Sequence, residues 1–266
     1  MRFIFSFDKR TTEVKNMAIT GQAQKYVAAW EAGLYEGFSE RTSARHSTPL
    51  LEGLISNLQN LGEDRELTRV LEAGAGLGSH ALRLVQEGFL VIANEYCETA
   101  TNEILRKIAK LSQSSQIRIK VAHGDILDCL RAQEYGSVAG FYAHSVFHTF
   151  SPKERRELYA EIGNVQPIGG IIAVSFKAEG DYVQNMSGTT SERSEAGLVI
   201  TDYAGGISRL FVTDITPLVR EFLDAGYRVL NTYKWDIPKK KGDVENPLEF
   251  RKFVGLLAKK TEGDRK

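Results

Sequence analysis

The sequence predicts an α/β protein built on a doubly wound, mostly parallel sheet of seven strands. Apolar, strand-like runs alternate with amphipathic helical segments from about residue 68 onward. This alternation is typical of a parallel sheet with helices on both faces. Residues 70–78 read Val-Leu-Glu-Ala-Gly-Ala-Gly-Leu-Gly, an apolar strand that enters a glycine-rich turn. A turn of this kind before a helix indicates a site for the polar group of a small ligand.

The expected elements follow one another in a regular order. The first strand covers 69–73, and the helix after it ends near Gly88, since glycine commonly terminates helices. Ser151 and Pro152 fit an N-cap followed by proline at the first helical position. The remaining strands are expected over 89–94, 117–122, 138–143, 171–176, 227–235 and 250–257, and the remaining helices over 98–111, 152–165 and 214–225.

The chain divides into three expected segments. Residues 1–47 are expected to form an N-terminal helical cap, 48–260 the ligand-binding domain and 261–266 a polar tail. Between the fifth strand and the last helix, 177–212 is too long for an ordinary connection in a compact domain. We therefore expect a lid-like insertion after strand five.

Composition limits the partners. The chain has 34 basic and 34 acidic residues, so its net charge is zero and general electrostatic attraction to nucleic acid should be weak. Its two cysteines have no metal-ligand spacing, so we expect no metal site. The apolar opening is too short for a signal peptide, and no run approaches a membrane span. These features favour a cytoplasmic protein with a small-molecule substrate, no membrane association and no nucleic acid. They do not predict the oligomeric state.

The glycine-rich turn admits two ligand classes. Read from Gly76, the sequence Gly-Leu-Gly-Ser-His-Ala fits a loose form of the dinucleotide pattern, so a nicotinamide cofactor stays open. Glu72 lies two residues before Gly74. A carboxylate there would repel a pyrophosphate but would attract the ammonium group of an amino-acid moiety.

This stretch, with Glu72 followed by three alternating glycines, resembles the first motif of class I S-adenosylmethionine-dependent methyltransferases. The resemblance covers roughly 48–260 and implies a Rossmann-like methyltransferase fold with S-adenosylmethionine as cofactor. It implies that Glu95 accepts hydrogen bonds from the ribose hydroxyls and that Asp125 accepts one from the adenine amino group. An aspartate that usually opens strand four is replaced by Ala139. The implied cofactor-binding residues are Glu72, Gly74, Ala75, Gly76, Gly78, Glu95, Tyr96, Asp125, Ile126 and Ala143.

His144 and His148 are the candidate general bases, because they follow strand four, where the methyl acceptor should approach. A base is needed chiefly when the acceptor is a neutral hydroxyl. His80 and His123 are expected to be spectators. The candidate substrate contacts are His46, Tyr203 and Arg209.

The resemblance implies transfer of a methyl group by direct displacement to the oxygen or nitrogen of a small molecule. A protein or RNA methyltransferase is a second hypothesis, although the chain has no Asn/Asp-Pro-Pro-Tyr motif. A member of the fold with another reaction, such as a nicotinamide-dependent oxidoreductase, is a third.

Overall fold

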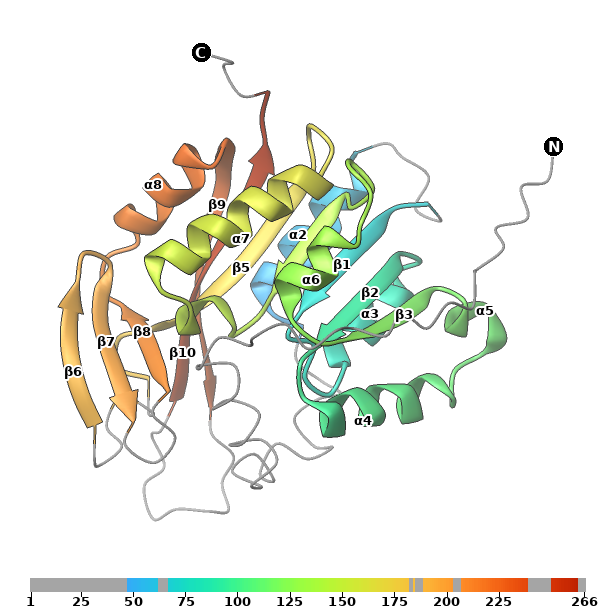
Figure 1. The fold of residues 1–266 in the computed structure, drawn as a ribbon, viewed down its shortest axis with the longest axis horizontal. Helices are drawn as coiled ribbons and strands as arrows, with labels where there is room; N and C mark the ends of the chain where they lie inside the picture. The colour runs from blue at the N-terminus through green and yellow to red at the C-terminus, as the bar shows by residue number, and fades with distance from the viewer. Residues whose placement is uncertain are drawn as a thin grey trace.

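The computed structural model describes residues 47–61, 67–181, 184, 189–202, 207–238 and 250–262 (Figure 1). The N-terminal segment before residue 47 and the candidate contacts His46 and Tyr203 lie outside these ranges. The strands are β1 (Arg69–Ala73), β2 (Leu90–Glu95), β3 (Ile119–His123), β4 (Gly140–Ala143), β5 (Ile171–Ala178), β6 (Thr189–Ser194), β7 (Gly197–Asp202), β8 (Ser208–Val212), β9 (Tyr227–Pro238) and β10 (Phe250–Lys260). The helices are α2 (Pro49–Gln59), α3 (Ser79–Gln86), α4 (Glu98–Ile108), α5 (Gln113–Gln116), α6 (Ile126–Arg131), α7 (Pro152–Val165) and α8 (Thr216–Asp224), with a 3-10 turn η2 (Phe147–Thr149).

The doubly wound sheet is confirmed. Strands β3, β2, β1, β4 and β5 lie side by side in this order and are parallel. Strand β10 pairs antiparallel with β5, and β9 pairs antiparallel with β10. These are the seven expected strands. The strand order reverses direction between β1 and β4, and ligands of such sheets bind at the carboxyl ends of the strands near this point.

Three further strands come from the insertion, which gives ten strands in the described part of the chain. Strand β8 continues the sheet beside the end of β5, where Phe211 pairs with Lys177, and β7 and β6 follow as an antiparallel extension (Figure 1). Gly197 begins β7 at a φ of 155°, and a Cβ there would overlap the Phe211 carbonyl oxygen. The insertion over 177–212 therefore includes ordered strands that the sequence analysis did not predict. Its role as a lid stays a prediction.

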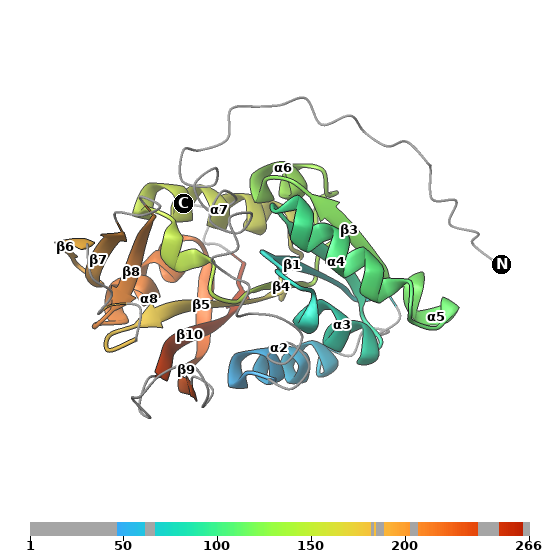
Figure 2. The ribbon, with the colours of Figure 1, turned by 90° about the horizontal axis from the view of Figure 1, so that it is seen from below.

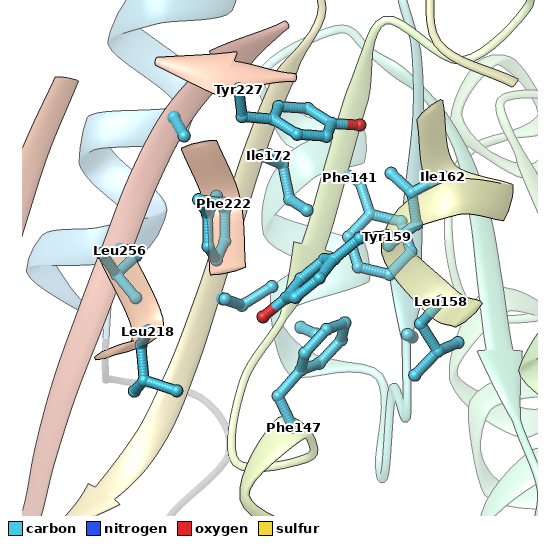
Figure 3. Close-up of a cluster of buried hydrophobic side chains, with 14 of the residues drawn as sticks. Phe141, Phe147, Leu158, Tyr159, Ile162, Ile172, Leu218, Phe222, Tyr227 and Leu256 are labelled. Atoms are coloured by element: carbon cyan, nitrogen blue, oxygen red, sulfur yellow. The ribbon is translucent and has the colours of Figure 1, made fainter. Parts of the chain in front are cut away.

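Helices cover both faces of the sheet (Figure 2). Residues of α2, α3 and α4 form one apolar cluster with one face of the sheet. Residues of α6, α7 and α8 form a second apolar cluster with the other face. The second cluster is rich in aromatic rings (Figure 3): the ring centroid of Tyr159 lies 5.6 Å from that of Phe147 and 4.9 Å from that of Phe222. These contacts join α7 to η2 and α8. The loops at the ends of β1 to β4 are therefore held by a packed core.

Local capping explains several helix boundaries. Thr48 caps α2 by accepting a hydrogen bond from the Leu51 N–H. Asp125 caps α6, a short helix that the sequence analysis did not predict. The longest described helix, α7, has 14 residues. Within the described ranges, no helix combines the length and apolar character needed to cross a membrane.

Helix α7 begins with the predicted cap, which supports a first stability prediction. The Ser151 hydroxyl accepts from the Glu154 N–H, and the Glu154 carboxylate accepts from the Ser151 N–H. We expect Ser151→Ala to lower the free energy of unfolding by about 1 kcal/mol. For a domain of this size, this corresponds to a melting temperature lower by about 2–4 °C in a thermal melt. The exposed neighbour Lys153 provides the control, since Lys153→Ala removes no cap. Equal melting temperatures for the two variants would contradict the capping role.

Candidate functional site

The glycine turn between β1 and α3 contains three glycines with positive φ. Their φ angles are 62° at Gly74, 55° at Gly76 and 78° at Gly78. A Cβ on Gly74 would lie 2.5 Å from a methyl carbon of Val146, and a Cβ on Gly78 would lie 3.0 Å from Ile104. A Cβ on Gly76 would meet no atom within 4 Å. Two of the glycines therefore permit close packing, while the middle one borders open space in which a ligand could approach the backbone.

Glu95, at the end of β2, holds this turn in place. Its Oε2 accepts a hydrogen bond from the Gly76 N–H at 2.7 Å. Its Oε1 accepts from the N–H groups of Tyr96 and Cys97, both at 2.9 Å. Burial raises the pKa of the Glu95 carboxyl, and these three hydrogen bonds oppose the shift. A carboxylate has about four lone-pair positions, so Glu95 keeps acceptor capacity for a further donor.

Glu72, within β1, is a second buried carboxyl at the turn. Its side chain is 2% exposed, and burial raises its pKa, while the nearby His80 opposes the shift. The Oε1 atom lies 3.6 Å from Nδ1 of His80. Within the described residues, the buried Oε2 atom has no hydrogen-bond partner. A buried carboxylate oxygen without a hydrogen-bond partner favours a ligand with a positively charged donor.

Asp125 brings a third carboxyl to the same edge of the sheet. Its Oδ1 accepts from the Leu127 N–H at 2.7 Å, and it lies near enough to Tyr96 to raise the pKa of the phenol, after the larger effect of burial. Ile126, next to it, is partly buried against the core. Ala143 ends β4, where it is fully buried and pairs with Ala73. The predicted cofactor residues therefore converge on the ends of β1 to β4, and their individual roles stay predictions.

His144 follows β4 and stands among aromatic rings from other elements. Its ring centroid lies 5.3 Å from that of His80, 5.9 Å from Trp235 and 4.8 Å from Phe253. Its side chain is half-buried. Burial lowers the pKa of its imidazole well below the usual value, and the positive charge of Lys177 adds to this effect. Through His80, this aromatic group is continuous with Glu72 and the glycine turn.

His148 occupies a different environment. It lies in η2, only 2% exposed, and burial lowers its pKa well below the usual value. Its buried Nδ1 has no hydrogen-bond partner among the described residues. Arg209, the one predicted substrate contact within the described ranges, is half-buried on β8 and contributes to the lowered pKa of His148. The structure thus brings His144, but not the interior His148, to the aromatic group beside the turn.

Several residues at the site were not singled out by the sequence analysis. They are Tyr142, Ser175, Lys177, Trp235 and Phe253. His80, which was expected to be a spectator, also lies at the site, next to Glu72 and His144. Ser175 offered a signal, because it interrupts an otherwise apolar strand, and Lys177 directly follows that run. Lys177 is buried with its Nζ 3.0 Å from the Asp181 carboxylate, and burial lowers its pKa to about 8. Trp235 and Phe253 gave no signal, since their position depends on the pairing of β9 with β10.

Comparison with known proteins identifies the fold. No protein-family model matches the sequence, and no curated protein matches it. The 1,6-didemethyltoxoflavin-N1-methyltransferase of Burkholderia thailandensis, solved with bound S-adenosylhomocysteine, is a similar structure: its TM-score is 0.61 at 15% identity, over 91% of this chain and 88% of that one. The chain has the fold of S-adenosylmethionine-dependent methyltransferases.

Two further solved structures have the same fold. Magnesium protoporphyrin IX methyltransferase from Synechocystis, also with bound S-adenosylhomocysteine, gives a TM-score of 0.60 at 12% identity, over 90% of this chain and all 100% of its own. An S-adenosylmethionine-dependent methyltransferase from Methanosarcina mazei gives 0.58 at 13% identity, over 82% of this chain and 99% of its own. At these identities the likeness is one of fold.

Proposed function

We propose that this protein is an S-adenosylmethionine-dependent methyltransferase that acts on a small molecule. The observation that supports this best is the group of carboxyls around the glycine turn, namely Glu72, Glu95 and Asp125. Three carboxyls at one edge would repel the pyrophosphate of a dinucleotide and would attract a cationic ligand. The buried Oε2 of Glu72, which has no partner among the described residues, suits an ammonium group.

Different residues of the chain would bind different parts of the cofactor. The open space at Gly76 lets the backbone approach the ligand, and Glu72 would accept from the ammonium group. Glu95 would accept from a ribose hydroxyl with its remaining lone-pair position, and Asp125 would accept from the adenine amino group. Tyr96 would lie beside Asp125 at the same pocket wall. When bound, S-adenosylmethionine supplies an activated methyl group on a sulfonium that carries its own leaving group.

The acceptor side supports a small organic substrate with a reactive oxygen or nitrogen. The rings of His144, Trp235 and Phe253 form a continuous aromatic group, in which the last two stack at 5.4 Å and 18°. Aromatic faces of this kind bind apolar or planar molecules. Substrate contacts from His46, Tyr203 and Arg209, and coverage by the insertion, remain part of the proposal. The helical cap expected over residues 1–47 is also part of the proposal.

Ligand-induced stabilisation tests the cofactor. A ligand at about one hundred times its Kd raises the free energy of unfolding by about 2.7 kcal/mol, which corresponds to roughly 5–10 °C in melting temperature. We expect S-adenosylhomocysteine to produce such a shift in a thermal melt and NADH at the same concentration to produce none. A shift with NADH alone would instead support the nicotinamide alternative and would reject the methyltransferase assignment.

A further inference from the structure

A buried serine connects the two polar residues that follow β4. Ser175 lies on β5 and is 0% exposed. Its Oγ is 2.8 Å from the backbone nitrogen of Ser145 and 3.0 Å from Nδ1 of His144. Among the described residues, Ser145 is the one non-glycine residue with positive φ, at 59°. The Ser175 hydroxyl thus fixes a strained turn that carries His144, and strain of this kind is commonly retained at functional sites.

The hydrogen bonds of Ser175 determine which nitrogen of His144 carries the proton. A backbone N–H can only donate, so Ser175 Oγ accepts from Ser145. The hydroxyl hydrogen then requires an acceptor, and Nδ1 of His144 is the acceptor that the described residues place within reach. If Nδ1 carried the proton instead, the buried hydroxyl would lose its acceptor, which is unfavourable. Nδ1 therefore accepts, and the proton resides on Nε2.

The surroundings of His144 also oppose the charged imidazolium. The titratable and charged groups that act on it are His80 from α3, Lys177 from β5 and Arg251 from β10, and each is cationic when protonated. The aromatic rings of Trp235 and Phe253 cover other sides. The charged groups named here include no carboxylate that would stabilise a positive charge on the ring. A general base must become charged during the reaction, so this environment is unfavourable for that role.

We propose that Ser175 is a positioning residue that holds His144 as the neutral Nε2–H tautomer, so that His144 offers a hydrogen-bond donor to the methyl acceptor. The donor role rests on the proposed function, whereas the tautomer does not. This donor role of His144 differs from the general-base role suggested by the sequence. A donor suits an acceptor atom that loses no proton and keeps a second lone pair for attack on the methyl carbon, such as a carboxylate oxygen. A neutral alcohol, which requires a base, would not suit this arrangement.

NMR of protein labelled with 15N at histidine tests the tautomer directly. The chain has five histidines, and comparison with His144→Gln assigns the His144 signals. We expect long-range 1H–15N correlations to show a neutral ring protonated at Nε2, with and without S-adenosylhomocysteine. The ring should stay neutral at pH 6, where an ordinary histidine is about three-quarters protonated. A ring protonated at Nδ1, or one that titrates near pH 7, would overturn the proposal.

Two serine variants separate positioning from general packing. Ser175→Ala should remove the preference for Nε2–H, so that both tautomers of His144 become populated. Ser137→Ala is the control, because Ser137 Oγ is also buried but has no hydrogen-bond partner in the described part of the chain. The control should leave the His144 signals unchanged. An unchanged tautomer in Ser175→Ala would reject the role of Ser175.

The binding of S-adenosylhomocysteine distinguishes failure of this inference from failure of the proposed function. Ser175→Ala should keep the affinity within about twofold, since the hydrogen bonds of Ser175 join it to His144 and Ser145 and not to the proposed cofactor residues. If the unmodified protein does not bind S-adenosylhomocysteine at all, the donor role loses its basis. The NMR measurement still decides the tautomer in that case.

Discussion

Gly76→Val is expected to abolish binding of S-adenosylhomocysteine while the protein stays folded. A Cβ at Gly76 would have no protein atom within 4 Å, so a valine side chain would extend into the open space beside the turn. It would also disturb the N–H group that donates to Glu95. Losing a buried hydrogen bond and gaining a steric clash should together weaken binding at least roughly a hundredfold, or about 2.8 kcal/mol. Calorimetric titration measures this loss, and circular dichroism verifies the fold.

Gly136→Val provides a matched control. Gly136 also has a positive φ, of 69°, and its Cβ position likewise faces open space. Any residue other than glycine in this backbone region costs about 1–2 kcal/mol, so both variants should lower the melting temperature. Gly76→Val should lower it somewhat further, because it also disturbs the hydrogen bond to Glu95. Only Gly76→Val should lose the ligand. Equal affinity in the two variants would mean that the glycine turn does not contact the cofactor.

The position of the proposed cofactor residues at one edge of the sheet was predictable, because its determinants are largely local in sequence. Strand β1, the glycines and Glu72 are contiguous, and their geometry follows from the backbone freedom of glycine and the apolar strand before it. The positions of Glu95 and Asp125 follow from one further rule, that parallel strands end at the same edge. The start of the helix at Pro152 was predicted, because Ser151 and Pro152 carry the capping signal themselves.

The aromatic group around His144, on the proposed acceptor side, was not predictable in the same way, since it depends on contacts between distant segments. Phe253 reaches His144 only through the antiparallel pairing of β10 with β5, in which it lies opposite Lys177. Trp235 follows because it pairs with Phe253. A shift of the register by one residue would turn both rings to the other face, and no local pattern fixes that register. The strands of the insertion depend similarly on the pairing of β8 with the end of β5.

The last prediction concerns Glu72→Gln, which should stabilise the ligand-free protein and weaken cofactor binding at the same time. Burial raises the pKa of this carboxyl, so ionisation is more costly in the folded state than in the unfolded state. The neutral amide of glutamine avoids that cost. It also removes the charge proposed to accept from the ammonium group. Losing a charged hydrogen bond should cost about 1.5–3 kcal/mol, or roughly tenfold to a hundredfold in affinity.

The effect on stability should grow with pH. For a carboxyl whose folded pKa is raised, the stabilising contribution is complete below the unfolded value near 4.5 and is lost as pH rises through the folded value. The gain in melting temperature of Glu72→Gln over the unmodified protein should therefore be small under acidic conditions and larger at pH 8. Glu134→Gln, at an exposed position, should change neither melting temperature nor affinity. Two results would each count against this account. An unchanged affinity of Glu72→Gln for S-adenosylhomocysteine would contradict the proposed contact with the ammonium group. A lower melting temperature of this variant at pH 8 would mean that the contact with His80 outweighs the cost of burial.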